Sequence, residues 1–317
     1  MPTQAARKSK TGRGAKGEDA VVAGVRLSNP DKLLYQDQGL TKRDMARYLE
    51  RVAPVMLPHV ANRLVTLVRC PAGSAGQCFY QRHIGTALPK TFRQLDVAPA
   101  EGGAEVEAYI YIGDKAGLVA AAQVGALELH IWGSHVDDVE RPDRLAFDLD
   151  PGEGVSFEEV KRAAADMRDA LEAVGLASHP MLTGGKGLHV VVPMTRRYEW
   201  PVVKAFCRAV AERLADRAPD RYVVNMSKAK RRGRIFLDYL RNERSATAIA
   251  PFSPRARHGA PVAWPVEWAD LPATGSAAEV TVADVLSGKR EPESWERYEA
   301  RQQITAGALA ALGVPEE

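Results

Sequence analysis

The most regular alternation of apolar and polar residues runs from Arg144 to Pro151. Leucine or phenylalanine occupies every second position from 145 to 149, and Asp148 and Asp150 fall on the intervening positions. This period of two is typical of a β-strand with one apolar face. Both carboxylates therefore leave the same face, with their Cα atoms about 6.8 Å apart. Pro151 lacks an N–H group, so it ends the strand.

After Pro151 the pattern predicts two helices and three further strands. The predicted elements are a helix with a capping box formed by Ser156 and Glu159 and ended by Gly175, strands near 179–182 and 188–193, a second helix with Pro201 in its first turn, and a strand at 234–240. Together with the strand at 144–151 they form the order β-α-β-β-α-β, which is the split βαβ or ferredoxin-like unit.

This topology brings distant polar residues together. In such a unit the first strand lies between the third and the fourth, so Asp148 and Asp150 are flanked by His189 and Asp238. Converging carboxylates repel each other unless a cation lies between them, and hard oxygen ligands suit Mg²⁺ or Mn²⁺. Without Asp238 and His189, an isolated Asp-x-Asp pair is more often a solvated acidic end of a strand.

The rest of the chain is less regular. Thr41 and Asp44 resemble a capping box that opens a helix, and 251–272 is a Pro-rich loop. The remaining expectations are strands at 21–27, 64–69, 106–112 and 126–132, a loop at 98–104, and a mainly helical end at 281–312. We therefore expect an α+β fold in which the β-α-β-β-α-β unit packs on an N-terminal α/β portion.

Composition is that of an ordinary soluble globular protein, with 317 residues, 45% hydrophobic and 26% charged. No apolar run approaches the roughly 18 residues of a membrane span, so no membrane partner is expected. Residues 1–18 carry five cationic side chains and no apolar stretch, which predicts a disordered basic tail. Cys70, Cys78 and Cys207 match neither a zinc quartet nor a disulfide framework, so we expect buried thiols in a reducing cytoplasm.

Charge is unevenly distributed although the net charge is only +3. Residues 221–244 contain eight Lys or Arg against two acidic residues, a local excess of six positive charges that points to a polyanionic partner. The run Lys228, Lys230, Arg231 and Arg232 precedes Asp238 directly and is suited to sequence-independent phosphate contacts. The alternative is a solvated loop.

The segment Thr183-Gly184-Gly185-Lys186-Gly187-Leu188-His189 is a candidate phosphate site. Its glycines can expose backbone N–H groups as an anion nest, to which Lys186 and His189 add charge or donors. A simple hairpin turn is the alternative. Three acids that hold two divalent ions occur in polymerases and in nucleases, and only a triphosphate pocket separates the two classes.

Other candidate residues carry weaker signals. His130 lies on the polar face of its strand and is either a structural histidine or part of the site. Phe79 and Tyr80, beside Arg82, are either core residues or a platform on which a base stacks. Asn29, Lys32 and Lys42 would otherwise belong to an ordinary turn before a helix.

Four segments carry a resemblance to a known family: Arg144–Asp150, Thr183–His189, Asn225–Lys230 and Phe236–Asn242. Together they resemble the polymerase domain of bacterial DNA ligase D, a member of the archaeo-eukaryotic primase superfamily, over roughly residues 20–300. The resemblance implies one primase-polymerase domain at 19–317, with its RRM-like catalytic unit at about 143–242. It also implies a template-dependent nucleotidyltransferase of the cytoplasm, associated with the nucleoid, that prefers ribonucleotides and Mn²⁺.

Such an enzyme would use NTPs or dNTPs to fill gaps and extend overhangs or 5′-phosphorylated ends in non-homologous end joining, with Ku and an ATP-dependent DNA ligase. The resemblance implies the following roles: Asp148, Asp150 and Asp238 as catalytic ligands of two Mn²⁺ or Mg²⁺ ions; His130, Thr183, Lys186, His189, Arg241 and Arg255 as nucleotide-binding residues; Asn29, Lys32 and Lys42 as a pocket for a DNA 5′-phosphate; and Phe79 or Tyr80 as the template-stacking residue.

Two departures qualify the resemblance. Thr183 stands where the family usually has Ser, which keeps the hydroxyl but leaves less room for a ribose. The chain contains no Lys-x-Asp-Gly ligase nucleophile, so it is not expected to seal a nick itself. Two rival functions remain at this point: a metal-dependent nuclease or phosphodiesterase that uses the same acids, and a non-catalytic module that bridges DNA ends.

Overall fold

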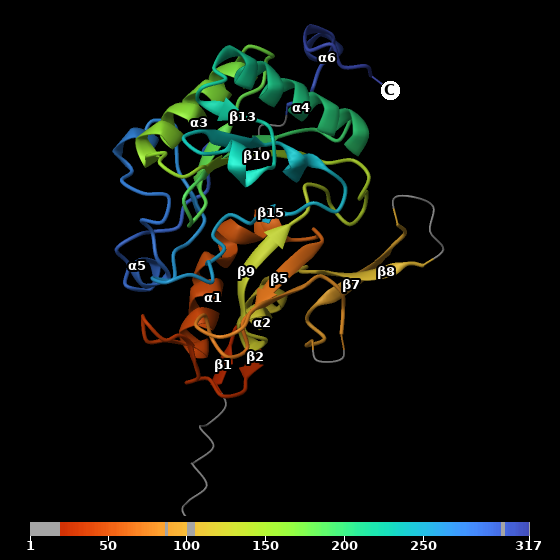
Figure 1. The fold of residues 1–317 in the computed structure, drawn as a ribbon. Helices are drawn as coiled ribbons and strands as arrows, with labels where there is room; N and C mark the ends of the chain where they lie inside the picture. The colour runs from red at the N-terminus through yellow and green to blue at the C-terminus, as the bar shows by residue number, and fades with distance from the viewer. Residues whose placement is uncertain (1–19, 86–87, 100–104, 299–301, 317) are drawn as a thin grey trace, which may run out of the picture.

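Two β-sheets organise the chain, each covered by its own pair of helices (Figure 1). The computed structural model describes residues 20–85, 88–99, 105–298 and 302–316, so the predicted basic tail at 1–18 lies outside the described residues. The larger sheet contains, from edge to edge, β13 (Tyr222–Val223), β14 (Ile235–Asp238), β10 (Arg144–Pro151), β12 (Leu188–Pro193), β11 (His179–Leu182) and β16 (Trp264–Pro265).

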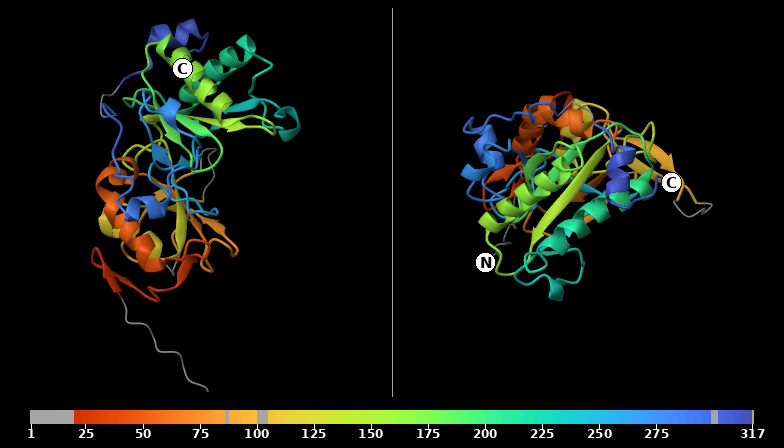
Figure 2. Two further views of the ribbon diagram at one scale, coloured as in Figure 1. Left: turned by 90° about the vertical axis from the view of Figure 1, so that its left-hand side faces the viewer. Right: turned by 90° about the horizontal axis from the view of Figure 1, so that it is seen from above.

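The central four strands of this sheet confirm the predicted unit. β10 lies between β12 and β14 and is antiparallel to both. Helices α3 (Phe157–Glu172) and α4 (Trp200–Arg217) pack on one face of the sheet. Figure 2 shows the two helices from above, side by side over the sheet. The Ser156 capping box is present, and a proline occupies the first turn of α4 as predicted. The opposite face of the larger sheet is turned toward the smaller sheet.

The smaller sheet has the order β15 (Ala248–Ile249), β9 (Ala126–Ile131), β5 (Val65–Arg69) and β6 (Phe79–Gln81). Helix α1 (Lys42–Val60) begins with the predicted capping box between Thr41 and Asp44 and packs against α2 (Lys115–Gln123). Helix α2 was not predicted from the sequence. This helix is buried from Gly117 to Ala122, so it lacks the amphipathic stripe by which surface helices are recognised.

Short elements complete the fold. They are β1 (Ala20–Val22), β2 (Val25–Leu27), β3 (Leu33–Tyr35), β4 (Leu40–Thr41), β7 (Arg93–Val97), β8 (Glu107–Tyr111), the 3₁₀ turns η1 (Lys228–Lys230), η2 (Leu240–Asn242) and η3 (Leu271–Ala273), and helices α5 (Val282–Leu286) and α6 (Ala306–Ala311).

Two predictions about these short elements were wrong. The single strand expected at 21–27 is a hairpin, because Ala23 and Gly24 both have positive φ and reverse the chain. In the end expected to be mainly helical, 281–312, the described residues form only the helices α5 and α6, and the described residues between them are irregular. No helix among the described residues is long and apolar enough to cross a membrane.

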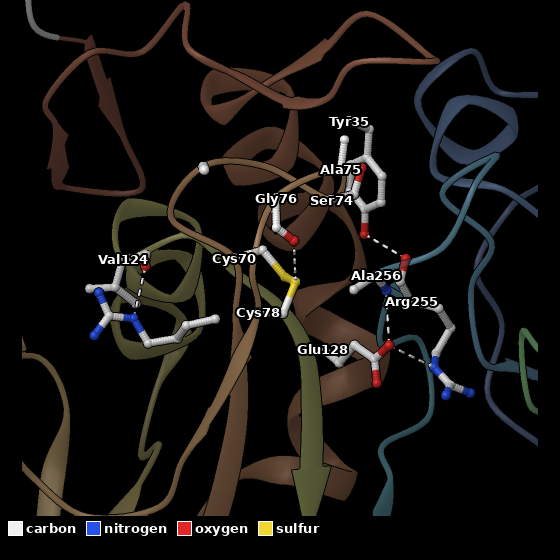
Figure 3. Close-up of a disulfide and its surroundings, with 12 residues drawn as sticks. Tyr35, Cys70, Ser74, Ala75, Gly76, Cys78, Val124, Glu128, Arg255 and Ala256 are labelled. Carbon is white, nitrogen blue, oxygen red and sulfur yellow. Dashed lines mark hydrogen bonds and ion pairs between the residues drawn. A yellow bond between two sulfur atoms is a disulfide. The ribbon is translucent and has the colours of Figure 1, made fainter.

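The expectation of free thiols at positions 70 and 78 was also wrong, because Cys70 and Cys78 form a disulfide (Figure 3). The two cysteines flank a tight loop. Arg69 in β5 pairs with Phe79 in β6, which places the adjacent cysteines opposite each other with Cα atoms 4.3 Å apart. Cys207 is free and buried, as expected.

Candidate active site

The three predicted acids meet on the face of the larger sheet that α3 and α4 leave uncovered. Asp148 in β10 pairs in register with Asp238 in β14 on one side and with His189 in β12 on the other. The Nε2 atom of His189 lies 3.5 Å from the carboxylate of Asp148. Asp150, two positions on, extends the acidic row toward solvent, with its side chain 55% exposed against 18% for Asp148.

Arg241 joins the two facing carboxylates. Its Nη2 atom lies 3.2 Å from Asp148 and 3.1 Å from Asp238. The 3₁₀ turn that carries Arg241 is held by Asn242, whose side-chain amide forms hydrogen bonds with both the N–H and the C=O of Ala146 in β10. Asn242 thus continues the hydrogen bonding of β14 past its end, and this fixes the neighbouring arginine over the acids.

Arg231 makes the corresponding contact with the third acid. Its guanidinium lies 3.1 Å from Asp150 and 3.9 Å from the centre of the Phe236 ring, and it donates to the carbonyl of Met226. Gly152 permits this arrangement, because a Cβ atom there would lie 1.8 Å from the carbonyl oxygen of Arg231. The basic segment is therefore packed directly against the strand that carries Asp148 and Asp150.

The surroundings of the three acids shift their pKa values in different directions. Burial opposes ionisation of Asp148, but His189 and Arg241 outweigh it and hold its pKa at about 2. Burial, reinforced by the charge of Asp148, raises the pKa of Asp150. Burial likewise raises the pKa of Asp238, against the opposing effect of Arg241. Asp148 is thus the most firmly ionised carboxylate of the site.

The donor set fits hard divalent cations, since three carboxylates converge on one face of the sheet. Among the residues that the structure describes, no three His, Cys, Asp or Glu side chains are grouped to hold one ion. The carboxylate oxygens that a cation would take are now in contact with Arg231 and Arg241. The metal-binding role of the acids therefore stays a prediction.

A cavity of about 770 Å³ opens in front of the acids, between the two sheets. The predicted nucleotide-binding residues all line it: His130, Thr183, Lys186, His189, Arg241 and Arg255. Asp148 and Asp150 line it as well, and so do Tyr80, Lys228, Arg231 and Arg257. The predicted residues thus come together from both sheets around one cavity, although their individual roles stay predictions.

The glycine-rich loop between β11 and β12 approaches β10 closely. A Cβ atom at Gly187 would lie 2.3 Å from the carbonyl oxygen of Leu149, and Gly184 has a φ of +65°. The hydroxyl of Thr183 donates to the carbonyl of Gly187 at 2.8 Å. Its hydrogen is therefore engaged, and only its lone pairs remain for a ligand. Lys186 is exposed at the cavity wall.

Phe79 and Tyr80 are exposed, 43% and 76% respectively, so they are not core residues. Tyr80 lines the cavity, and its ring centre lies 6.5 Å from that of His130. Phe79 lies under the guanidinium of Arg69 at 5.4 Å. The structure therefore places Tyr80 beside the candidate nucleotide pocket and Phe79 beside a different basic group.

The four residues predicted to contact the DNA backbone differ in their surroundings. Lys228, Lys230 and Arg232 are exposed on the segment before β14. Arg231 is only 16% exposed and contacts Asp150, so its guanidinium is directed toward the acids. A phosphate contact by Arg231 would require it to release Asp150.

A second, smaller cavity of about 220 Å³ brings Lys32 and Lys42 together. Lys42 is 7% exposed and donates to the carbonyl of Ser28 at 2.7 Å. Its pKa is lowered, mainly by burial and to a smaller extent by the charge of Lys32. Arg69 also lines this cavity, which the sequence analysis did not foresee. Asn29 does not line it, but its carbonyl accepts the N–H of Lys32 in the adjacent turn.

Glu128 is a second residue that the sequence analysis missed. It is buried in β9 beside the large cavity and contacts both His130 and Arg255. The only available signal was its position two residues before His130, on the same face of the strand. In an alternating pattern, a glutamate at such a position is normally interpreted as exposed to solvent.

Residues 41–295 match the family described as the LigD primase-polymerase domain, and the chain belongs to this family. It is 34% identical to the multifunctional non-homologous end joining protein LigD of Pseudomonas aeruginosa over 98% of its own length. Over 78% of its length it is 34% identical to the LigD protein of Mycolicibacterium smegmatis. The chain covers 37% and 32% of these relatives, so it spans about a third of their length.

A solved structure described as the polymerase domain of Mycobacterium tuberculosis ligase D in complex with DNA is 33% identical to this chain. Its fold superposes with a TM-score of 0.79, and the match covers 87% of this chain and 98% of the other. The predicted α+β primase-polymerase fold is therefore confirmed, and the chain is a nucleotidyltransferase domain of the primase-polymerase type.

Proposed function

We propose that this chain extends DNA ends and fills gaps by template-directed nucleotidyl transfer during non-homologous end joining. One observation carries the proposal: Asp148, which pairs in register with Asp238, lines the same cavity as Lys186 of the glycine-rich loop and His189 of β12. A carboxylate pair alone also suits a nuclease. The added set of phosphate-binding and donor side chains suits a nucleoside triphosphate as the substrate.

Two divalent ions, Mn²⁺ or Mg²⁺, would be held by Asp148, Asp150 and Asp238. When bound, they would supply the charge that activates a primer 3′-hydroxyl and stabilises the leaving pyrophosphate. Arg241 lies beside the acids. When a nucleotide binds, its guanidinium would release the carboxylates and contact the triphosphate instead. Lys186 and His189 would hold the phosphates, and His130 and Arg255 would bind the nucleotide from the opposite wall.

Ribonucleotides are the proposed preferred substrate. The Thr183 hydroxyl already donates to Gly187, so its lone pairs can accept a hydrogen bond from a ribose 2′-hydroxyl. A site built to bind a hydroxyl discriminates strongly against a sugar that lacks it. Tyr80, exposed at the mouth of the cavity, would stack on a template base, while Lys228, Lys230 and Arg232 contact the DNA backbone.

The smaller cavity supports a second part of the proposal. Lys32, Lys42 and Arg69 form a cationic pocket that would bind the 5′-phosphate on the downstream side of a gap. In the cell, the partners would be such broken ends together with Ku and an ATP-dependent ligase. The site of action would be the cytoplasm, at the nucleoid where the chromosome lies.

Primer extension on gapped DNA tests the function. We expect elongation that follows the template, depends on Mn²⁺ or Mg²⁺ and is faster with NTPs than with dNTPs. Shortening of the primer under the same conditions would favour the nuclease. Binding of the gapped DNA without any change in primer length would favour the non-catalytic bridging module.

A further inference from the structure

Glu128 is a buried carboxylate at the wall of the large cavity, with 7% of its surface exposed. One oxygen, Oε2, lies 2.8 Å from the Nε2 atom of His130. The other, Oε1, accepts the N–H of Ala256 at 2.9 Å and lies 3.2 Å from the Nε atom of Arg255 (Figure 3). Both side chains that Glu128 contacts line the cavity.

Arg255 is in turn fixed at two further points. Its Nη1 atom donates to the carbonyl of Thr183 at 2.5 Å, and its own carbonyl accepts the hydroxyl of the buried Tyr35 at 2.8 Å. Glu128 therefore belongs to a chain of contacts that runs from β9 through Arg255 to the glycine-rich loop. This chain connects the wall of the cavity formed by the smaller sheet with the wall formed by the larger sheet.

We propose that Glu128 is a positioning residue that orients His130 and Arg255 toward the incoming nucleotide. The inference rests on the nucleotide-binding role proposed above for those two residues. An ionised carboxylate only accepts hydrogen bonds, so the proton of a neutral His130 must reside on Nε2. The Nδ1 atom then remains as an acceptor for the ligand. A carboxylate partner fixes the tautomer and the ring orientation of histidines in the same way in other sites.

The ionisation state of Glu128 agrees with this role. Burial opposes its ionisation, but His130, Arg255 and the N–H of Ala256 outweigh burial and bring its pKa to about 2. Glu128 is therefore ionised at neutral pH and can bind both partners at once.

Asp143 offers a matched control within the same chain. It is also a buried carboxylate that contacts one arginine and one histidine, at 2.6 Å from Arg63 and 3.0 Å from His135. None of these three residues lines the large cavity. A purely structural contribution of a buried carboxylate should therefore appear equally in Asp143→Asn and in Glu128→Gln.

The first test compares steady-state extension by the two variants at saturating gapped DNA. Glu128→Gln should raise the KM for the nucleotide at least about tenfold, since the hydrogen bond to His130 loses its charge and the ion pair with Arg255 is lost. Its affinity for DNA should stay within about twofold of wild type. Asp143→Asn should lower the melting temperature and leave the nucleotide KM within about twofold of wild type.

The second test reads the tautomer directly by ¹⁵N-histidine NMR of the wild-type protein, with His130→Ala used to assign the signal. We expect the Nε2–H form for His130, and a mixture of tautomers in Glu128→Gln. An Nδ1–H form in wild type would overturn the inference, and this test stands even if Glu128→Gln does not fold.

Failure of the proposed nucleotide pocket can be distinguished from failure of the role of Glu128. Unchanged KM in both His130→Ala and Arg255→Ala would refute the nucleotide pocket itself. A raised KM in those two variants with wild-type KM in Glu128→Gln would refute only the role of Glu128.

Discussion

Asp148 and Asp238 stand directly opposite each other on two antiparallel strands, and a single guanidinium, that of Arg241, contacts both. Two facing carboxylates would repel each other at neutral pH without a neighbouring positive charge. The arginine supplies that charge in this structure. The same requirement explains why the pair is suited to divalent cations, and it underlies the catalytic proposal.

The pocket of Lys32 and Lys42 predicts a strong dependence of binding on the 5′-phosphate. Charge-assisted hydrogen bonds contribute roughly 1.5 to 3 kcal/mol each, so Lys32→Ala should weaken binding to a phosphorylated gap about 10- to 150-fold. DNA with a 5′-hydroxyl should bind weakly to wild type and be little affected by the mutation. Fluorescence anisotropy at one fixed salt concentration measures both. Equal weakening for the two DNAs would make Lys32 a general backbone contact.

The Thr183 hydroxyl predicts the choice of sugar. Thr183→Val keeps the shape of the side chain but removes the lone pairs that would accept from a ribose 2′-hydroxyl, so it should lower kcat/KM for ribonucleotides more than for deoxyribonucleotides. The measurement is kcat/KM for matched NTP and dNTP pairs in both proteins. Equal values for the two sugars in wild type would remove this role from Thr183.

The low pKa of Glu128 predicts a loss of stability in acid. Its folded pKa of about 2 lies below the ordinary value of 4.5, so its contribution is complete above pH 4.5 and declines as the pH falls toward 2. Between pH 6 and pH 3.5 wild type should lose about 1.4 kcal/mol of unfolding free energy more than Glu128→Gln. Urea denaturation at both pH values gives the difference. A constant gap between the two proteins would show that Glu128 is not ionised with a depressed pKa.

The disulfide predicts a specific labelling pattern. In the oxidised protein, iodoacetamide should modify neither Cys70 nor Cys78 even after unfolding, while the buried Cys207 should react only once the chain is unfolded. Closing a loop of this size stabilises a protein by about 2.5 kcal/mol, so Cys78→Ser should lose roughly that amount. Mass spectrometry and urea unfolding provide the two readouts. Labelling of Cys78 in the native protein would mean that the pair is reduced.

Local sequence patterns were sufficient to predict the catalytic part of the fold. The alternation around Asp148 and the order of the elements predicted the central strands correctly, and the capping box at Ser156 predicted the start of α3. Helix α2 could not be predicted in this way, because a helix that is buried all round shows no stripe.

The side-chain contacts of the site were less predictable than its position. In the sequence, Arg231 is one more cation in a run that is expected to be exposed. The structure shows that it packs against Gly152 and contacts Asp150. In the sequence, Glu128 is a polar position of an amphipathic strand, whereas in the folded chain it is buried and contacts Arg255 and Ala256. Such contacts depend on segments more than 80 residues apart, which local periodicity does not report.

The most direct test of the catalytic proposal is single-turnover primer extension with Asp238→Asn, which replaces a carboxylate with an amide of the same shape. Loss of a metal ligand removes several kcal/mol of transition-state stabilisation, so the rate should fall about 1,000-fold or more. Asp216→Asn, the same change at an exposed position on α4, serves as the control and should extend at the wild-type rate. Binding of gapped DNA by Asp238→Asn should stay near wild type. An Asp238→Asn protein that extends primers at a rate comparable to wild type would contradict the assignment of the catalytic acids.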